Sequence, residues 1–213
     1  MRPLRLGVLG GSFDPVHVGH LHVARAAQRA FALDRVVFVP AARPPHKPGR
    51  TLASGLDRAS MLEIAVAREP GWLVSTIELE REGPSYTIDT LRALPAELGL
   101  DAELELYLLI GGDNLAGLTT WREARSLLRL VQPVVVVRAG DEPDALARVR
   151  AELGDEVADR LERGLVRVEP VEVSATELRA ALARGEDPAE ALPPGVLEYI
   201  RSRGIYSGAA ESS

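Results

Sequence analysis

The segment that decides the fold of this chain is Gly10-Gly11-Ser12-Phe13-Asp14-Pro15-Val16-His17-Val18-Gly19-His20. It follows the apolar run Leu4–Leu9, which predicts a buried strand that ends in a tight glycine turn. It leads into residues 19–31, where apolar side chains recur at helical spacing. A strand, a glycine-rich loop and a helix in this order bring backbone N–H groups and the positive end of a helix dipole together. The segment therefore predicts an anion-binding site at the start of this helix.

The segment differs from the common phosphate-binding fingerprints. It is not G-x-G-x-x-G, and it lacks the Gly-Lys-Ser/Thr ending of a P-loop. The alternative interpretation is an ordinary glycine turn followed by two incidental histidines, whose charge the helix start would disfavour. His17 and His20 lie three residues apart and bracket Gly19, which permits close backbone approach. This spacing favours a ligand site.

Further along the chain, apolar strands alternate with helices. The predicted strands are 36–39, 72–80, 104–110, 134–137, 166–168 and 171–173, and the predicted helices are 54–68, 86–98, 121–129, 144–163 (long or broken), 176–184 and 194–203. Strands that are apolar throughout indicate an α/β fold: a Rossmann-like, doubly wound parallel sheet with helices on both faces. Ligands then bind beyond the carboxyl ends of the strands, which points to the loops after Leu9, Val39, Ile110 and Val173. We expect one domain over residues 1–206 and a disordered tail over 207–213.

Composition excludes several classes of protein. The 213 residues include 31 acidic and 25 basic side chains, a net charge of −6, which argues against a nucleic-acid partner. With no cysteine, the chain has no disulfide, thiolate nucleophile or Cys-ligated metal. No apolar run approaches the roughly 18 residues of a membrane span, and no signal peptide is evident, so we expect a soluble cytoplasmic protein without a membrane partner. The sequence leaves the oligomeric state open.

The chain contains one lysine. Every other basic residue is arginine, and Lys47 follows the proline-stiffened stretch Pro44-Pro45-His46. The arginine bias is explained equally well by a genome-wide habit. A compact ammonium, however, approaches a phosphate where a guanidinium does not fit. Lys47 is therefore a candidate substrate-binding residue.

A second motif, Ser174-Ala175-Thr176-Glu177-Leu178-Arg179, follows the predicted strand 171–173. Taken alone, Ser174 and Glu177 fit a plain capping box at a helix start. Taken with the first motif, the strand-to-helix position predicts a second anion site, from which Arg179 reaches distal phosphates.

The first motif resembles the His-x-Gly-His signature of the nucleotidyltransferase superfamily, which is shared with class I aminoacyl-tRNA synthetases. In that superfamily both histidines contact ATP phosphates, which implies the same catalytic role for His17 and His20. The second motif resembles the superfamily's Ser-x-Thr-x-x-Arg element. That element usually follows an isoleucine-serine pair, whereas this chain has Glu172-Val173 there, a departure that leaves the phosphate contacts intact.

A third set of residues narrows the substrate. The stretches Ser85–Leu91, Ile110–Leu115 with Trp121, Pro40–Lys47 and Leu192–Ile200 resemble nicotinate-nucleotide adenylyltransferases, and the likeness extends to Tyr206. Gly112 stands where alanine or serine is frequent, a small departure. Trp72 lies in an apolar strand and is expected in the core. Trp121 lies in a polar stretch at a predicted helix start, where it either stacks on a flat ligand or simply packs beside a cap formed by Thr120 and Glu123.

The resemblance implies transfer of AMP from ATP to nicotinate mononucleotide, which gives nicotinate adenine dinucleotide and pyrophosphate. It assigns His17, His20 and Arg179 to catalysis, and ATP binding to these three with Gly10, Gly11, Ser12, Phe13, Gly111, Asp113, Ser174 and Thr176. It assigns the mononucleotide to Lys47, Ser85, Tyr86, Thr87 and Trp121, with Thr87 and Trp121 holding the pyridine ring. Asp113 is expected to bind ribose hydroxyls.

We expect no metal ligands from the chain itself, because His17 and His20 have no third ligand at suitable spacing. Mg²⁺ is expected as a cofactor held mainly by the ATP phosphates and water. Three alternatives stay open. The acceptor is nicotinamide mononucleotide, or it is another phosphorylated small molecule such as pantetheine phosphate or, with cytidylate transfer, glycerol phosphate. In the third, the chain is a nucleotide-sensing module without catalysis.

Overall fold

The computed structural model describes residues 2–43, 52–100, 103–138 and 145–207. Six parallel strands form one sheet in the order β3-β2-β1-β4-β5-β6. The strands are β1 (Leu4–Gly11), β2 (Arg35–Pro40), β3 (Trp72–Val74), β4 (Leu104–Gly111), β5 (Gln132–Arg138) and β6 (Leu165–Val168). The helices are α1 (Val18–Phe31), α2 (Gly55–Val66), α3 (Ile77–Glu80), α4 (Thr87–Glu97), α5 (Gly112–Leu115), α6 (Ala124–Leu130), α7 (Ala145–Leu153), α8 (Asp155–Arg163), α9 (Ala175–Ala183) and α10 (Val196–Arg203), with 3-10 helices η1 (Leu118–Thr120) and η2 (Ala189–Ala191). The predicted α/β class is confirmed.

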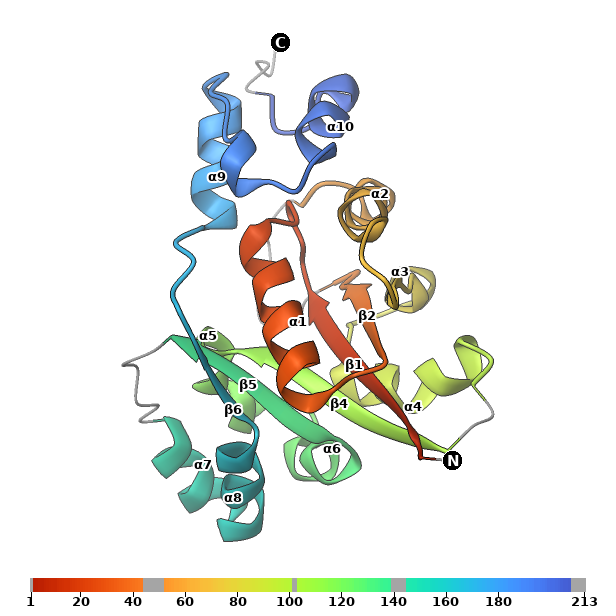
Figure 1. Cartoon of the computed structure of the whole chain (residues 1–213), viewed down its shortest axis with the longest axis vertical. Coiled ribbons are helices and arrows are strands. Elements are labelled where there is room, and N and C mark those ends of the chain that lie inside the picture. Colours follow the sequence, from red (N-terminus) through yellow and green to blue (C-terminus); the bar gives the residue numbers. More distant parts are fainter. Residues whose placement is uncertain (1, 44–51, 101–102, 139–144, 208–213) are drawn as a thin grey trace.

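The strand order reverses between β1 and β4. From β1 the chain builds outward through β2 and β3, and it then returns to pair β4 with the other side of β1. In an open parallel sheet, this reversal leaves a crevice beyond the carboxyl ends of the two central strands. Figure 1 shows α1 crossing one face of the sheet, and α9 and α10 lying beyond the upper end of β1.

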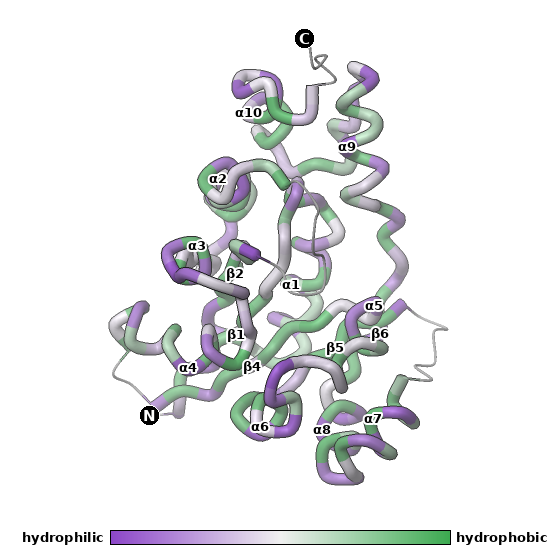
Figure 2. Tube along the Cα trace, turned by 180° about the vertical axis from the view of Figure 1, so that it is seen from behind, coloured by the Kyte–Doolittle hydropathy of each residue, from purple (hydrophilic) through white to green (hydrophobic). Residues whose placement is uncertain are grey.

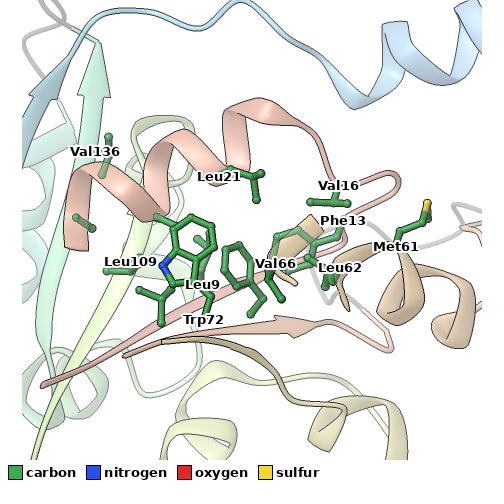
Figure 3. Close-up of a cluster of buried hydrophobic side chains, with 14 of the residues drawn as sticks. Leu9, Phe13, Val16, Leu21, Met61, Leu62, Val66, Trp72, Leu109 and Val136 are labelled. Atoms are coloured by element: carbon green, nitrogen blue, oxygen red, sulfur yellow. The ribbon is translucent and has the colours of Figure 1, made fainter. Parts of the chain in front are cut away.

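Two hydrophobic clusters cover the two faces of the sheet. In β2, Val36 and Phe38 belong to one cluster, while Val37 and Val39 belong to the other. This alternation follows from the two-residue period of a strand, and it is why strands buried on both faces are apolar throughout. Figure 3 shows the cluster beneath α1, in which Trp72 packs among aliphatic side chains, as predicted for a core residue. In Figure 2 the central strands are largely green, whereas the covering helices alternate green with purple.

The glycine turn predicted after the first strand is wrong. Gly10 and Gly11 remain in β1, and Gly11 pairs with Pro40 of β2. The chain turns after the strand, where Phe13 adopts a left-handed φ of 47°. Its ring is 1% exposed and lies 6.0 Å from the ring of Phe38. Burial of this ring stabilises a backbone conformation that local sequence would assign to glycine.

Three element predictions need correction. Residues 72–80 were expected to be extended, but β3 ends at Val74 and α3 follows, because the Thr76 carbonyl accepts the N–H groups of Leu79 and Glu80. Residues 171–173 form no strand, because Val168 already pairs with Arg138, the last residue of β5, and the chain continues past that strand end. The helix expected from Trp121 begins at Ala124, after Trp121 closes η1. The long helix 144–163 is broken at Gly154, whose φ is 94°.

The structure bears on three further predictions: the cap of α2, the C-terminal tail and the absence of a membrane-spanning helix. Ser54 caps α2 as expected, since its hydroxyl oxygen accepts the Asp57 N–H at 3.0 Å. Of the tail predicted for 207–213, only Ser207 lies within the described residues. Among the helices that the structure describes, none is long and apolar enough to cross a membrane.

Candidate active site

A cavity of about 810 Å³ lies at the reversal of strand order. Its volume falls within the range of roughly 300–1,000 Å³ that is usual for small-molecule sites. Its wall includes residues from all four predicted loops, namely Gly10–Asp14, Ala41, Gly111–Ala116 and Val173–Thr176. The remaining wall comes chiefly from the first turns of α1 and its N-cap, from the start of α4, from Trp121 and Arg122, and from the ends of β5 and β6. The cavity therefore lies at the carboxyl ends of the strands, where the sequence predicts ligand binding.

The end of β1 presents main chain to this cavity. A Cβ atom built at Gly10 would meet no atom within 4 Å, so a side chain there would extend into the open space of the site. Gly11 packs against the ring of Phe13, which a Cβ atom would approach to 3.2 Å. Ser12 follows in the same wall. The strand therefore offers a smooth backbone surface to a ligand.

His17 and His20 lie together at the N-terminus of α1. Their rings stack with centroids 3.7 Å apart, and His17, the N-cap residue, is 8% exposed. The His17 backbone N–H donates to Nδ1 of His20 at 3.2 Å. Because Nδ1 of His20 accepts this bond, the neutral imidazole carries its proton on Nε2 and acts as a donor there. Both rings line the cavity.

Burial controls the charge of His17. It lowers the pKa of this imidazole from 6.5 to about 4, because the buried ring loses the water that would stabilise its charged form. In the free protein His17 is therefore neutral at pH 7. An anion bound at the α1 N-terminus would oppose this shift by favouring the charged form.

Gly19 brings the second predicted motif against the first. A Cβ atom at Gly19 would lie 2.7 Å from Cγ1 of Val173 and 3.1 Å from Nδ1 of His17. Only glycine allows the segment before α9 to pass this close to α1. The N-termini of α1 and α9 consequently border the same cavity, and both helices have N–H groups in their first turn without acceptors in the helix.

The capping-box interpretation of Ser174 is wrong. Ser174 is the N-cap of α9, but its side chain makes no cap hydrogen bond. Ser174 and Thr176 instead line the cavity.

Arg179 is not among the residues that line the cavity, but it contacts Asp14, which is one of them. Its guanidinium donates to the Asp14 carbonyl oxygen at 2.5 Å and to Oγ1 of Thr176 at 3.2 Å. The same group lies 3.6 Å from the Asp14 carboxylate, and the Arg179 side chain is 19% exposed. The structure thus brings Arg179 to the loop after β1, next to the phosphate-binding residues predicted from sequence.

The other end of the cavity is formed around the start of α4. Tyr86 is the N-cap residue, Thr87 is the first helical residue, and both line the cavity with Trp121. Trp121 is partly buried against the hydrophobic cluster of this face. The Arg122 guanidinium lies 4.6 Å from the centre of the Tyr86 ring, a cation–π contact.

The Ser85 side chain forms hydrogen bonds to the backbone that the sequence did not indicate. Its hydroxyl oxygen accepts the N–H groups of Ala42 at 3.0 Å and Arg43 at 3.3 Å. These bonds tie the loop after β2 to the start of α4. Beside them, the buried Glu78 carboxylate accepts from Oγ1 of Thr90 at 2.6 Å, and burial raises the pKa of Glu78.

The last predicted residues lie at the end of β4. Gly111 is the final strand residue, and Asp113 is exposed on the cavity wall. A Cβ atom at Gly112 would approach Cγ1 of Val137 to 3.2 Å, so glycine suits this position. Lys47 lies outside the described residues.

Sequence reasoning missed Asp14, Glu78 and Tyr206. Asp14 is 1% exposed and accepts a hydrogen bond from the Tyr206 hydroxyl at 2.6 Å. A carboxylate inside the decisive segment was an available signal for Asp14. Tyr206 has no local signal, because Asp14 lies 192 residues away along the chain. The bond between Glu78 and Thr90 depends on how α3 packs against α4.

Within residues 2–43, 52–100, 103–138 and 145–207, no three His, Asp or Glu side chains form a group that could hold a metal ion.

Comparison with known proteins identifies the family. A family model described as "Cytidylyltransferase-like" matches residues 8–181. Proteins named "Probable nicotinate-nucleotide adenylyltransferase" from Chromobacterium violaceum and Aeromonas hydrophila subsp. hydrophila are 41% and 43% identical over 210 and 211 residues, and the matches cover 95% and 94% of this chain and 98% and 96% of theirs. The solved Plasmodium falciparum nicotinic acid mononucleotide adenylyltransferase complexed with NaAD shares the fold, with a TM-score of 0.73 at 17% identity, over 95% of this chain and 97% of that one. This chain belongs to the nicotinate-nucleotide adenylyltransferase family.

Proposed function

We propose that this protein transfers AMP from ATP to nicotinate mononucleotide and releases pyrophosphate. The observation that carries the proposal is a single cavity with two unlike ends. One end has paired histidines and two helix N-termini, and the other has aromatic side chains at the start of α4. The names of the relatives, which match over nearly the whole chain, support the same reaction.

ATP would lie along the end of β1, with its phosphates at the N-termini of α1 and α9. Gly10, Gly11, Ser12 and Phe13 would offer main-chain contacts, and Ser174 and Thr176 would add hydroxyl donors. Nε2 of His20 would donate to a phosphate oxygen, beside the neutral His17. Arg179 would supply positive charge to the distal phosphates. Donors fixed before the reaction stabilise developing charge without reorganising.

Nicotinate mononucleotide would occupy the other end of the cavity. Its pyridine ring would stack on Trp121 beside Thr87, and its carboxylate would face the first turn of α4, where N–H groups have no acceptor in the helix. Tyr86 would contribute to the same wall. Ser85 would act through the backbone bonds that fix the loop after β2.

The reaction needs no covalent intermediate with the protein. A phosphate oxygen of nicotinate mononucleotide forms a bond to the α-phosphorus of ATP, and the bond from that phosphorus to the bridging oxygen breaks. Pyrophosphate leaves with the electron pair. Because the nucleophile is already an anion, the chain has to supply only positioning and charge stabilisation.

Three further assignments complete the proposal. Asp113 would bind ribose hydroxyls from the end of β4, next to Gly111, and Lys47 would contact a phosphate. Mg²⁺ would enter on the ATP phosphates, and it would neutralise part of their charge. The ATP requirement fits the cytoplasmic location that the sequence suggests.

The most direct test is to incubate the purified protein with ATP, Mg²⁺ and nicotinate mononucleotide and to assay pyrophosphate. We expect pyrophosphate and dinucleotide in equal amounts. Binding of ATP without turnover would instead indicate a nucleotide sensor. Turnover only with another phosphorylated acceptor would reassign the substrate.

A further inference from the structure

A buried polar cluster lies behind the phosphate end of the cavity. Its centre is Asp14, 1% exposed, in the loop between β1 and α1. Oδ1 of Asp14 accepts from the Tyr206 hydroxyl at 2.6 Å and from the Ala53 N–H at 3.0 Å. Oδ2 lies 3.6 Å from the Arg179 guanidinium. The carboxylate therefore joins the loop after β1, the start of α2, α9 and the segment after α10.

Tyr206 enters this cluster from the far end of the described chain. It follows α10, and its φ of 60° puts it in the left-handed region, uncommon for tyrosine. Burial, together with the hydrogen bond to Asp14, raises the pKa of the Tyr206 hydroxyl. The hydroxyl consequently stays protonated and donates to Asp14 at any pH at which the protein would work.

A second arginine fixes the same loop from another side. Arg58 of α2 is 2% exposed and donates to the carbonyl oxygens of Ser12 and Ala41 at 2.8 Å each. The backbone on both sides of Asp14 is thereby held by Arg58 and Arg179. The hydrogen bonds from Tyr206 and Ala53 to Oδ1 contribute to the orientation of the carboxylate itself.

We propose that Tyr206 is a positioning residue for the proposed reaction: its hydroxyl orients the Asp14 carboxylate, and Asp14 in turn holds the Arg179 guanidinium beside the phosphate end of the cavity. The inference rests on the proposed function in taking Arg179 as a phosphate ligand. Without the Tyr206 hydroxyl, the carboxylate loses the 2.6 Å hydrogen bond to Oδ1 and gains freedom to rotate. Arg179 would then sample positions in which it no longer faces a phosphate.

The chain provides a matched control. The Tyr199 hydroxyl also donates to an aspartate, Oδ1 of Asp57, at 2.9 Å, and it also belongs to the C-terminal helical region. Asp57 has no described link to Arg179. Tyr206→Phe and Tyr199→Phe each remove one hydroxyl and keep the ring. If the Tyr206 hydroxyl had a purely structural role, the two variants would show similar changes in ligand binding, activity and stability.

The test compares Tyr206→Phe with Tyr199→Phe in the wild-type chain and in an Arg179→Lys background. Lysine keeps a positive charge beside Asp14, which protects the fold, but it cannot reproduce the guanidinium contacts. The readouts are the Kd for α,β-methylene-ATP with Mg²⁺, kcat/KM for ATP, and Tm.

We expect Tyr206→Phe to weaken binding of the analogue and to lower kcat/KM by about ten-fold, as for other coupled neighbours. Tyr199→Phe should change neither quantity by more than about two-fold, because its contacts do not lead to Arg179. In the Arg179→Lys background, loss of the Tyr206 hydroxyl should have little further effect.

An unchanged Kd for Tyr206→Phe, or the same fold-loss in the Arg179→Lys background, would overturn the positioning role. The Kd measurement needs no turnover. A wild-type protein that binds the analogue but releases no pyrophosphate therefore contradicts the proposed function alone, and the Tyr206 comparison is still decided by binding.

Discussion

The two histidines at the start of α1 lie in unlike environments although their rings stack. His17 is buried and neutral, whereas His20 is more exposed and has Nδ1 engaged by the His17 backbone N–H. These differences predict different roles. His20 is placed to donate to a ligand, and His17 is held uncharged until an anion arrives.

Replacing His20 with alanine should lower kcat by roughly 10²–10³, the usual cost of removing one donor that stabilises developing charge. The fold should persist, because His20 is not part of either hydrophobic cluster. Steady-state kinetics with a thermal melt on the same sample checks this. Near-normal turnover by the folded variant would remove His20 from the mechanism.

Stability should depend on pH through His17. Its folded pKa of about 4 lies below the unfolded value of 6.5, so below pH 6.5 the unfolded chain binds a proton that the folded chain does not. The free energy of unfolding should therefore fall by about 2 kcal/mol between pH 7 and pH 5 from this group alone. It should depend little on His17 above pH 6.5.

Urea unfolding of the wild-type chain and of His17→Asn measures this contribution, since all other titrating groups are shared. The difference between the two free energies should narrow as pH falls. Parallel profiles would show that His17 is not buried as described.

At the residue scale, the sequence predicted which residues lie at the cavity better than it predicted which side chains they contact. The residues of the first motif lie on the cavity as expected, because their neighbours are local. The link between Tyr206 and Asp14 spans 192 residues and depends on how α10 packs, which no local pattern contains.

At the scale of elements, strands and helices with strong apolar periodicity were predicted within a few residues. The failures fall where hydrogen bonding or the sheet edge overrides composition. Residues 171–173 lie past the end of β5, whose last residue pairs with Val168, and so they form no strand. Residues 77–80 form a helical turn around the Thr76 carbonyl. Helix α6 begins at Ala124 and not at Trp121, where the sequence predicted its start. Of the two helices expected beside the proposed ring site, α4 is therefore the one whose first turn borders it.

The contact between the α1 start and the segment before α9 yields a prediction. Gly19→Ala should lower the free energy of unfolding by about 1–2 kcal/mol, because its Cβ atom overlaps Val173 and the crowded site resists repacking. It should also raise KM for ATP, since both helix N-termini must shift.

Gly117→Ala is the matched control for this change. At Gly117 a Cβ atom would meet only the Asn114 carbonyl oxygen, at 3.8 Å, and the backbone φ of −90° suits alanine. Chemical denaturation gives the free energy of unfolding of both variants, and kinetics at varied ATP concentration gives their KM for ATP. Equal stabilities for the two variants would contradict the close packing at Gly19.

At the scale of the whole molecule, the reversal of strand order gives the protein its site. Both hydrophobic clusters pack on one sheet, and the cavity opens where β1 and β4 separate at their carboxyl ends. We propose on this basis that residues 1–206 act as one domain. The sequence predicted the sheet type and the four loops, whereas the contact of Arg179 with Asp14 depends on packing between α9 and the loop after β1.

The two ends of the cavity should respond separately to mutation. Trp121→Ala should raise KM for nicotinate and nicotinamide mononucleotides alike, by roughly three- to ten-fold, because stacking does not distinguish a carboxylate from an amide. Trp121→Phe should restore most of the loss. A large change in the ratio of the two kcat/KM values would place Trp121 at the carboxylate instead.

The central claim is best tested by offering the protein equal concentrations of nicotinate mononucleotide and nicotinamide mononucleotide with limiting ATP and Mg²⁺, and by quantifying both dinucleotides by mass spectrometry. The first turn of α4 and the nearby Arg122 favour an anion, and an amide would leave a buried N–H donor unpaired. The account predicts that the acid dinucleotide exceeds the amide dinucleotide by roughly 10²–10⁴. Comparable amounts of the two would contradict acid specificity, and the absence of both would contradict adenylyl transfer to a pyridine mononucleotide.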